Sequence, residues 1–175
     1  MMFEPRLSDR DAWSIGDRCS AGRVLELLST RTVFLVVREC FYGTTRFEHF
    51  ATRIGTSAPA VSRALKQLES AGVVERVPYR EPGRRERAEY RLTAAGEDLL
   101  PIFLSLMQWG DKYLQDGEPP LSFVDRESGA VVGVRVTPEP VPDKRADEIE
   151  IRLNSSGRKR PAASGQPTGP WASDA

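Results

Sequence analysis

The chain has 175 residues, and its 25 basic and 25 acidic side chains give a formal net charge of +0. The length allows one domain with appendages, and the balanced charge argues against a protein that binds polyanions over its whole surface. Two cysteines make no disulfide scaffold, and no apolar run approaches the roughly 20 residues that span a bilayer.

The beginning of the chain predicts a polar arm followed by two helices. Residues 1–18 are polar with mixed charge and lack the apolar centre of a signal peptide, so we expect a cytoplasmic protein that is not bound to a membrane. From Ser20 the apolar spacing predicts a helix that ends near Thr30. The next segment, 33–41, is apolar on most sides and favours a central buried helix closed by Gly43. Its β-branched residues also suit a strand, and both alternatives stay open.

A third and a fourth helix are predicted to form a helix-turn-helix. Thr45 and Glu48 fit a capping box at the start of the third helix. Gly55 allows a tight turn, Thr56 offers a capping oxygen, and Gly72 supplies the end of the fourth helix. An apolar stripe at helical spacing should face the core; it consists of Val61, Leu65 and Leu68.

The opposite face of this fourth helix is short, polar and basic. We predict that it reads DNA through a set of candidate residues: Ser57, Pro59, Ser62, Arg63, Lys66 and Gln67. An ordinary solvated surface helix is the alternative, since basic outer faces are common.

Two alternating segments after Gly72 predict a β-hairpin wing. The first covers 73–79, the second covers 88–92, and Pro82-Gly83 marks the turn between them. The segment from Arg46 to Thr93 contains ten basic and six acidic residues, so it carries a net positive charge. The rest of the chain is correspondingly acidic. A solvated charged loop is the alternative to a phosphate-contacting tip, for which the candidate residues are Arg84, Arg85 and Arg87.

A further helix is predicted to follow Thr93 and to bend at Pro101. This long C-terminal helix is more apolar than a small domain can cover, so it is either core or the surface that pairs with a second chain. We favour a dimer, with the interface residues Leu25, Leu28, Leu104, Met107, Trp109 and Tyr113.

The remainder divides by composition. Residues 118–140 predict a small appended β-hairpin, in which 121–123 and 131–136 flank a turn. Residues 141–175 predict a mostly disordered tail, with the strand-like stretch 148–153 left undecided.

The order and spacing of these pieces resemble the HxlR-type family of winged helix-turn-helix, MarR-like transcriptional regulators. The resemblance covers roughly 15–115 and rests on short motifs: Arg31-Thr-Val-Phe-Leu-Val-Val-Arg-Glu-Cys40, Leu65-Lys-Gln-Leu-Glu-Ser-Ala-Gly72, Glu89-Tyr-Arg-Leu-Thr93 and Trp109-Gly-Asp111. It implies a homodimer built from the first and last helices, with 57–71 in the major groove and the hairpin near 80–88 along the DNA backbone. Thr56 stands where many relatives carry an aliphatic residue, which would loosen the turn.

The sequence contains few candidate residues for catalysis, metal binding or redox chemistry. His49 is the single histidine, and residues 125–129 lack the histidine and cysteine that similar hairpins carry, so we expect no metal and no cofactor. Nothing marks a nucleophile or a phosphate loop, so we expect no enzyme. Cys19 precedes a helix start beside Arg18 and Arg23, where positive charge and the helix dipole favour a thiolate. It is a candidate redox sensor, and a plain half-buried thiol is the alternative.

We conclude from the sequence that the fold is mainly α with a small β wing. Its expected domains are an arm (1–18), a winged helix-turn-helix with a dimerisation helix (19–117), the hairpin (118–140) and the tail (141–175). The expected function is sequence-specific binding of double-stranded DNA by a homodimeric regulator, most simply a repressor, that responds to a redox or small-molecule effector. The alternative is a winged module that holds a protein partner, and salt-dependent DNA binding separates the two.

Overall fold

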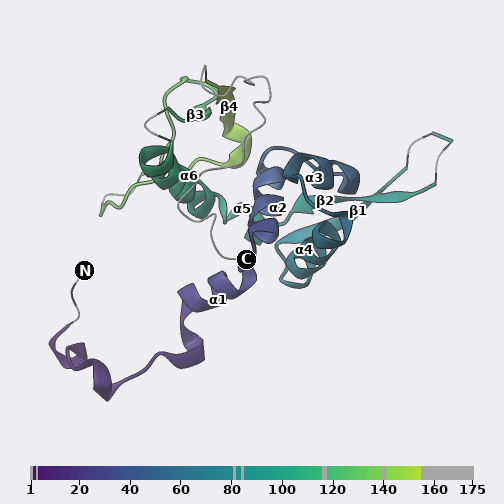
Figure 1. The fold of residues 1–175 in the computed structure, drawn as a ribbon. Helices are drawn as coiled ribbons and strands as arrows, with labels where there is room; N and C mark the ends of the chain where they lie inside the picture. Colours follow the sequence, from purple (N-terminus) through teal and green to yellow (C-terminus); the bar gives the residue numbers. More distant parts are fainter. Residues whose placement is uncertain are drawn as a thin grey trace, which may run out of the picture. The chain divides into compact units, whose positions relative to one another are not determined.

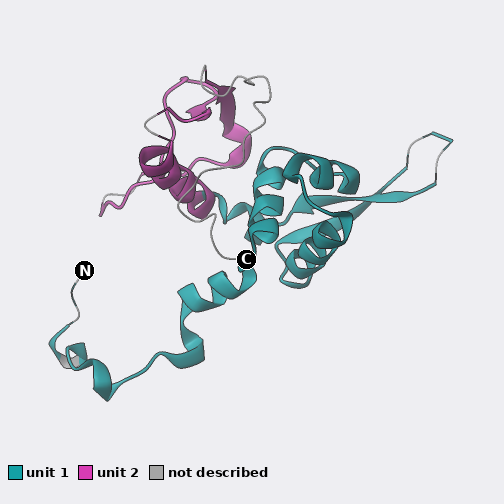
Figure 2. Ribbon diagram, viewed as in Figure 1, with its two compact units in different colours: residues 1–100 teal, residues 101–175 magenta. Residues whose placement is uncertain are grey.

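The structure is a computed structural model that describes residues 2, 4–80, 82–83, 85–115, 118–138 and 141–154. The chain forms two compact units, residues 1–100 and residues 101–175 (Figure 2). This division differs from the expected domain of 19–117, because residues 101–117 group with the segments that follow them. The fold is mainly helical with two small antiparallel sheets, which confirms the predicted class (Figure 1).

Two helices open the first unit. Cys19 precedes α1 (Ser20–Leu27), and its Sγ accepts the N–H of Gly22 at 3.4 Å. The Thr30 hydroxyl caps α2 (Arg31–Phe41). The helical interpretation of this second segment is correct, and its buried aliphatic residues follow a helical spacing: Val33, Val36 and Val37. Three short 3-10 turns precede α1: η1 (Pro5–Leu7), η2 (Arg10–Ala12) and η3 (Gly16–Arg18).

The helix-turn-helix consists of α3 (Phe47–Ile54) and α4 (Ala58–Ser70). Gly55 joins them with a φ of 70°, a left-handed conformation that glycine adopts without steric cost. Helices α2, α3 and α4 contact one another and enclose one apolar core. Its buried members are Val33, Val36, Val37, Phe50, Ile54, Val61, Ala64, Leu65, Leu68, Val73 and Val74.

The predicted capping box at Thr45 and Glu48 does not form. Arg46 is the residue that precedes α3, and no side-chain cap is present there. The carbonyl of Thr45 instead accepts the N–H of Tyr90 at 2.8 Å, and Arg46 forms a β-bridge with Glu89. This segment is therefore extended and paired with the wing, which moves the helix start past Thr45.

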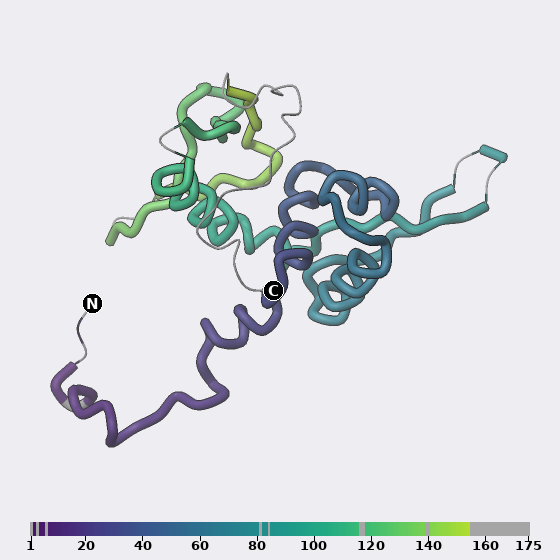
Figure 3. Tube along the Cα trace, in the orientation of Figure 1, coloured from purple at the N-terminus to yellow at the C-terminus, as the bar shows by residue number. Residues whose placement is uncertain are grey.

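The wing is the antiparallel hairpin of β1 (Val74–Tyr79) and β2 (Arg87–Leu92). Val74 pairs with Leu92 at the root, and the register continues without interruption to the ends of both strands. The two strands extend away from α3 and α4 (Figure 3). The hairpin prediction is thereby confirmed, with the loop at 80–86.

Thr93 closes the root of the hairpin. Its hydroxyl donates to the Gly72 carbonyl at 2.5 Å and accepts the Gly96 N–H at 3.2 Å, so it also caps the short helix α5 (Ala94–Glu97). A Cβ at Gly96 would collide with the Val73 carbonyl oxygen. Glycine at this position therefore allows α5 to lie directly against the chain that enters β1.

The bend expected at Pro101 is absent because the helix is interrupted earlier. α5 ends at Glu97, and α6 (Leu100–Leu114) begins one residue before the proline. Proline has no N–H to donate, and the first turn of a helix is where that loss costs least. Pro101 thus lies in the first turn of α6 rather than within a longer helix.

The second unit contains α6 and a two-stranded sheet of β3 (Leu121–Asp125) and β4 (Ile149–Leu153). The predicted pairing within 118–140 forms only next to the turn, where Val132 donates to the Phe123 carbonyl at 2.9 Å and Asp125 donates to that of Ala130 at 2.8 Å. Along its whole length β3 pairs instead with β4. Val131 makes only an isolated bridge to Val124.

The strand at 149–153 also corrects part of the predicted tail. It is preceded by a 3-10 turn, η4 (Ala146–Glu148), and together they give regular structure to the undecided stretch. The rest of that prediction, for 155–175, lies outside the described residues.

Few apolar side chains are buried in the second unit. The rings of Phe103 and Phe123 meet edge to face, with centroids 5.9 Å apart. The buried apolar residues described in this unit are Phe103, Leu104, Phe123, Val124 and Ile149.

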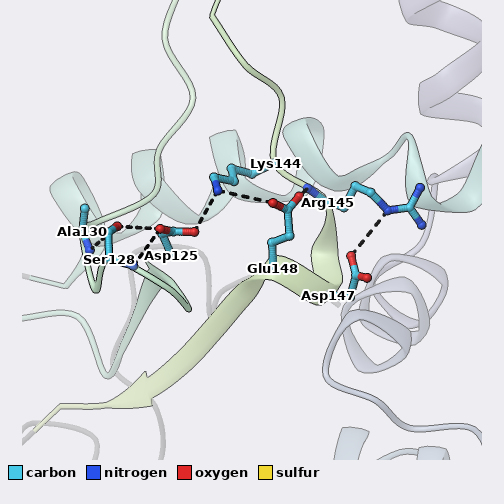
Figure 4. A network of polar contacts seen from close by, with 7 residues as sticks. All are labelled: Asp125, Ser128, Ala130, Lys144, Arg145, Asp147 and Glu148. Carbon is cyan, nitrogen blue, oxygen red and sulfur yellow. Dashed lines mark hydrogen bonds and ion pairs between the residues drawn. The ribbon is translucent and has the colours of Figure 1, made fainter.

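A network of polar contacts connects the turn after β3 with the segment before β4 (Figure 4). Asp125 accepts both the N–H and the hydroxyl of Ser128, and Lys144 lies 3.0 Å from its other oxygen. Lys144 also reaches Glu148 at 3.3 Å. The hydrogen bond from the Ser128 hydroxyl, with that from Lys144, lowers the pKa of Asp125 to about 2. The carboxylate therefore holds the turn after β3 to the segment before β4.

Candidate DNA interface

The inner face of α4 is anchored in the core of the first unit. Four of its residues are buried, which confirms the predicted apolar stripe: Val61, Ala64, Leu65 and Leu68. Because these anchors fix the rotation of the helix about its axis, they also fix which side chains point outward.

The outward face presents hydroxyl groups and cations. Ser57, Pro59, Ser62, Arg63 and Lys66 are exposed. The Ser57 side chain makes no capping bond to α4. Among the described residues, no ion pair involves Arg63 or Lys66. These groups have the donors that base edges and phosphates accept.

Gln67 departs from this set. It is half-buried, and its Nε2 donates to the carbonyl of Leu27 in α1 at 2.8 Å. The side chain amide is therefore directed toward α1, unlike the other residues of α4 that were predicted to face DNA. Helical periodicity predicts on which face of a helix a residue lies. It does not predict which group the side chain contacts on that face.

The structure describes two of the three arginines predicted at the wing. Arg84 lies outside the described residues. Arg85 is exposed in the loop before β2, and Arg87 is the first residue of β2. The Arg87 guanidinium lies 3.6 Å from the carboxylate of Glu48 in α3, and both side chains are about half exposed. An ion pair this exposed contributes little stability.

Two further cations at the wing were missed by the sequence reasoning. The Arg46 guanidinium lies over the ring of Tyr79 at 5.0 Å, and that of Arg76 lies over Tyr90 at 5.9 Å. Stacking on a ring orients a guanidinium without neutralising it. Each strand of the wing contains an arginine and a tyrosine, which was a signal for Arg76 but not for Arg46, the residue that precedes α3.

The residues assigned to a dimer interface differ in exposure. Leu25 is 70% exposed, Trp109 is 56% exposed and Tyr113 is 57% exposed. Leu104 is only 5% exposed, so the chain itself covers it, contrary to its assignment. Leu28 and Met107 are half-buried. Three large apolar residues of α6 that were not assigned are exposed: Ile102, Leu106 and Leu114.

The two cysteines are in different environments. Burial raises the pKa of Cys40 to about 12, so this side chain remains a thiol and acts as part of the packing. Cys19 is half-buried at the start of α1, where its sulfur accepts a backbone N–H.

Within the described ranges, no group of three or more histidine, cysteine, aspartate or glutamate side chains is placed to hold a metal ion. In the same part of the chain, no helix has the length and apolar character of a membrane span.

The arrangement of α3, α4 and the wing agrees with comparisons to known proteins. The sequence profile described as HxlR-like helix-turn-helix matches residues 27–118. The chain belongs to the HxlR-like helix-turn-helix family. Its members among curated proteins include an uncharacterized HTH-type transcriptional regulator of Mycobacterium tuberculosis, which is 39% identical over 142 residues, covering 73% of this chain and 89% of that one.

Two other relatives extend the comparison. An uncharacterized HTH-type transcriptional regulator of Synechocystis is 32% identical over 101 residues, covering 57% of this chain and 73% of that protein. The crystal structure of PA1607, a candidate transcription factor, is 31% identical and superposes with a TM-score of 0.62 over 70% of this chain and 85% of that one. The chain is a DNA-binding transcriptional regulator with a winged helix-turn-helix fold.

Proposed function

We propose that the regulator binds a specific DNA operator with α4 in the major groove and the β1–β2 wing along the phosphate backbone. The observation that carries this proposal is the composition of the outward face of α4. Ser62, Arg63 and Lys66 are exposed there, and the core residues behind them fix their direction. Base edges would be read by these side chains, and phosphates would be contacted by the wing and the helix termini.

The proposal includes a homodimer. The homodimer is supported by apolar side chains that are exposed on α1 and α6, because soluble chains rarely leave large apolar patches open to water. These side chains include Leu25, Ile102, Leu106 and Trp109. A two-fold dimer would present two copies of α4 about 34–36 Å apart, one turn of DNA, so the operator should be a pseudo-palindrome.

Repression is the regulatory mode that follows most simply from this geometry. A dimer bound across a promoter excludes the polymerase by occupying the same DNA. The cytoplasm, where a bacterial chromosome lies, is the compartment in which such a protein would act.

Cys19 remains the candidate for a redox or small-molecule response. It is half-buried at the start of α1 and accepts the N–H of Gly22, so oxidation or alkylation would remove the cap of this helix. If it senses, alkylation should change operator affinity and Cys19→Ser should abolish that change. Equal affinity before and after complete alkylation would remove the sensor from the proposal.

The deciding experiment is a gel-shift and footprint series with the DNA upstream of the regulator's own gene. Specific binding should give one protected pseudo-palindrome, and log affinity should fall linearly with log salt concentration. A chain that binds no duplex DNA at low salt, but retains a protein from the same cells, would instead be an interaction module.

A further inference from the structure

Gln67 is a residue of the reading helix that faces inward to another helix. Its Nε2 donates to the Leu27 carbonyl at 2.8 Å across a separation of 40 residues. Leu27 is the last residue of α1, where carbonyl groups have no partner within the helix. The side chain of Gln67 therefore satisfies an acceptor that α1 cannot satisfy itself.

The attachment of α1 to the rest of the first unit is otherwise thin. α1 has no buried residue, and only Leu27 and Leu28 at its end pack against the core. A hydrogen bond at this end fixes the direction in which α1 leaves the core, because apolar contacts alone are non-directional. The donor belongs to α4, one turn beyond Arg63 and next to Lys66.

We propose that Gln67 is a positioning residue for operator recognition. Its hydrogen bond connects the end of α1 to α4 and so fixes the orientation of the outward face of α4 relative to α1. This inference rests on the proposed function. A displacement of α1, whether by a second copy or by a change at its capped start, would reach α4 through this bond. Base contacts would respond most, since phosphate contacts tolerate small rotations that base contacts do not.

The test uses Gln67→Leu in the full chain, which keeps the bulk and the helical preference of the side chain but removes the donor. Gln108→Leu is the matched control. Gln108 also bonds a backbone group at 2.8 Å, accepting the N–H of Val134, but it lies in the second unit. Both variants therefore lose one glutamine-to-backbone bond of the same length.

Hydrogen exchange and DNA binding are measured on both variants. In Gln67→Leu the amides of α1 should exchange about fivefold faster, the factor that corresponds to one ordinary hydrogen bond. Operator affinity should fall by about three- to tenfold, with affinity for random DNA and the salt slope unchanged. Gln108→Leu should leave α1 exchange and operator affinity as in the wild type.

Three results would overturn the inference. Equal losses of operator affinity in the two variants would indicate general destabilisation. A loss in Gln67→Leu without faster α1 exchange would mean that Gln67 contacts DNA directly. Unchanged exchange together with unchanged affinity would show that the bond positions nothing. If the wild type binds no DNA, the proposed function fails, and α1 exchange alone still decides whether Gln67 holds α1.

Discussion

The two units of the regulator are stabilised in different ways. The first buries eleven apolar residues in one cluster shared by α2, α3, α4 and the start of the wing. In the second, the described part of the chain buries five such residues and adds the Asp125 network, while several apolar side chains of α6 stay exposed. The first unit has the core of a self-sufficient domain. The exposed apolar side chains of the second support the proposal that a second copy of the chain covers them.

The largest expected effect comes from breaking the core of the first unit. Phe50 is completely buried and meets the ring of Tyr90 edge to face. Phe50→Ala should lower the free energy of unfolding by about 3–5 kcal/mol, because it removes contacts and leaves a cavity. Urea unfolding followed by circular dichroism measures the loss. A matched Phe123→Ala should leave hydrogen exchange in α2 and α4 unchanged, and faster exchange there would show that the two units are not independent.

The second unit is tested through assembly. Trp109→Ala should weaken the dimer by about 2–4 kcal/mol, as for an aromatic side chain at the centre of an interface. Sedimentation equilibrium would show the shift toward monomer. Val136→Ala is the control, since Val136 is fully exposed but lies outside α6. A wild-type chain that sediments as a monomer at micromolar concentration would contradict the dimer itself.

Arg63→Ala should affect binding and not folding. Operator affinity should fall by about 1–3 kcal/mol if the guanidinium contacts a base edge, while an exposed position has little packing to lose. Fluorescence anisotropy with operator and random duplexes measures both affinities. Wild-type affinity in this variant would mean that α4 is not the reading helix.

Arg85→Ala in the wing is the contrasting variant. It should weaken operator and random DNA alike and reduce the salt slope by about 1, as expected for one lost phosphate contact. An effect restricted to the operator, with the slope unchanged, would assign base reading to the wing.

The smallest effect concerns pH and the second unit. The folded pKa of Asp125, about 2, lies below its ordinary value of 3.8. Its ionised form therefore favours folding fully above pH 3.8, and this contribution disappears as the pH falls toward 2. Amide exchange in β3 should rise over this range, more than in α4. Asp125→Asn should remove the pH dependence, and a variant that keeps it would assign the effect to another carboxyl group.

Local patterns were sufficient for most of the first unit. The spacing of Val61, Leu65 and Leu68 identified the inner face of α4, and alternation identified the two strands of the wing. Each of these signals lies within a single element, so neighbouring residues carry it. The same reasoning gave the outward direction of Arg63 and Lys66.

Three of the differences from the predictions share a physical cause, which is a partner distant in the sequence. Thr45 does not cap α3 because Tyr90 uses its carbonyl. Gln67 faces inward because the carbonyl of Leu27 lies there. β3 pairs along its whole length with the distant β4, and with the nearer valine-rich run only around the Val124–Val131 bridge. Short-range periodicity contains no information about which distant group completes a hydrogen bond.

In the proposed complex, a phosphate that binds Arg87 would have to exchange with the carboxylate of Glu48. In the free protein the guanidinium has a carboxylate partner 3.6 Å away, so a phosphate that takes its place must displace an anion already present. Such an arginine releases fewer bound ions from solution than one that was previously solvated. Arg87 lies at the loop end of β2, opposite the root where Val74 pairs with Leu92. At that end of the strands, the phosphate in the proposed complex would replace an existing ion pair rather than the water around a solvated guanidinium.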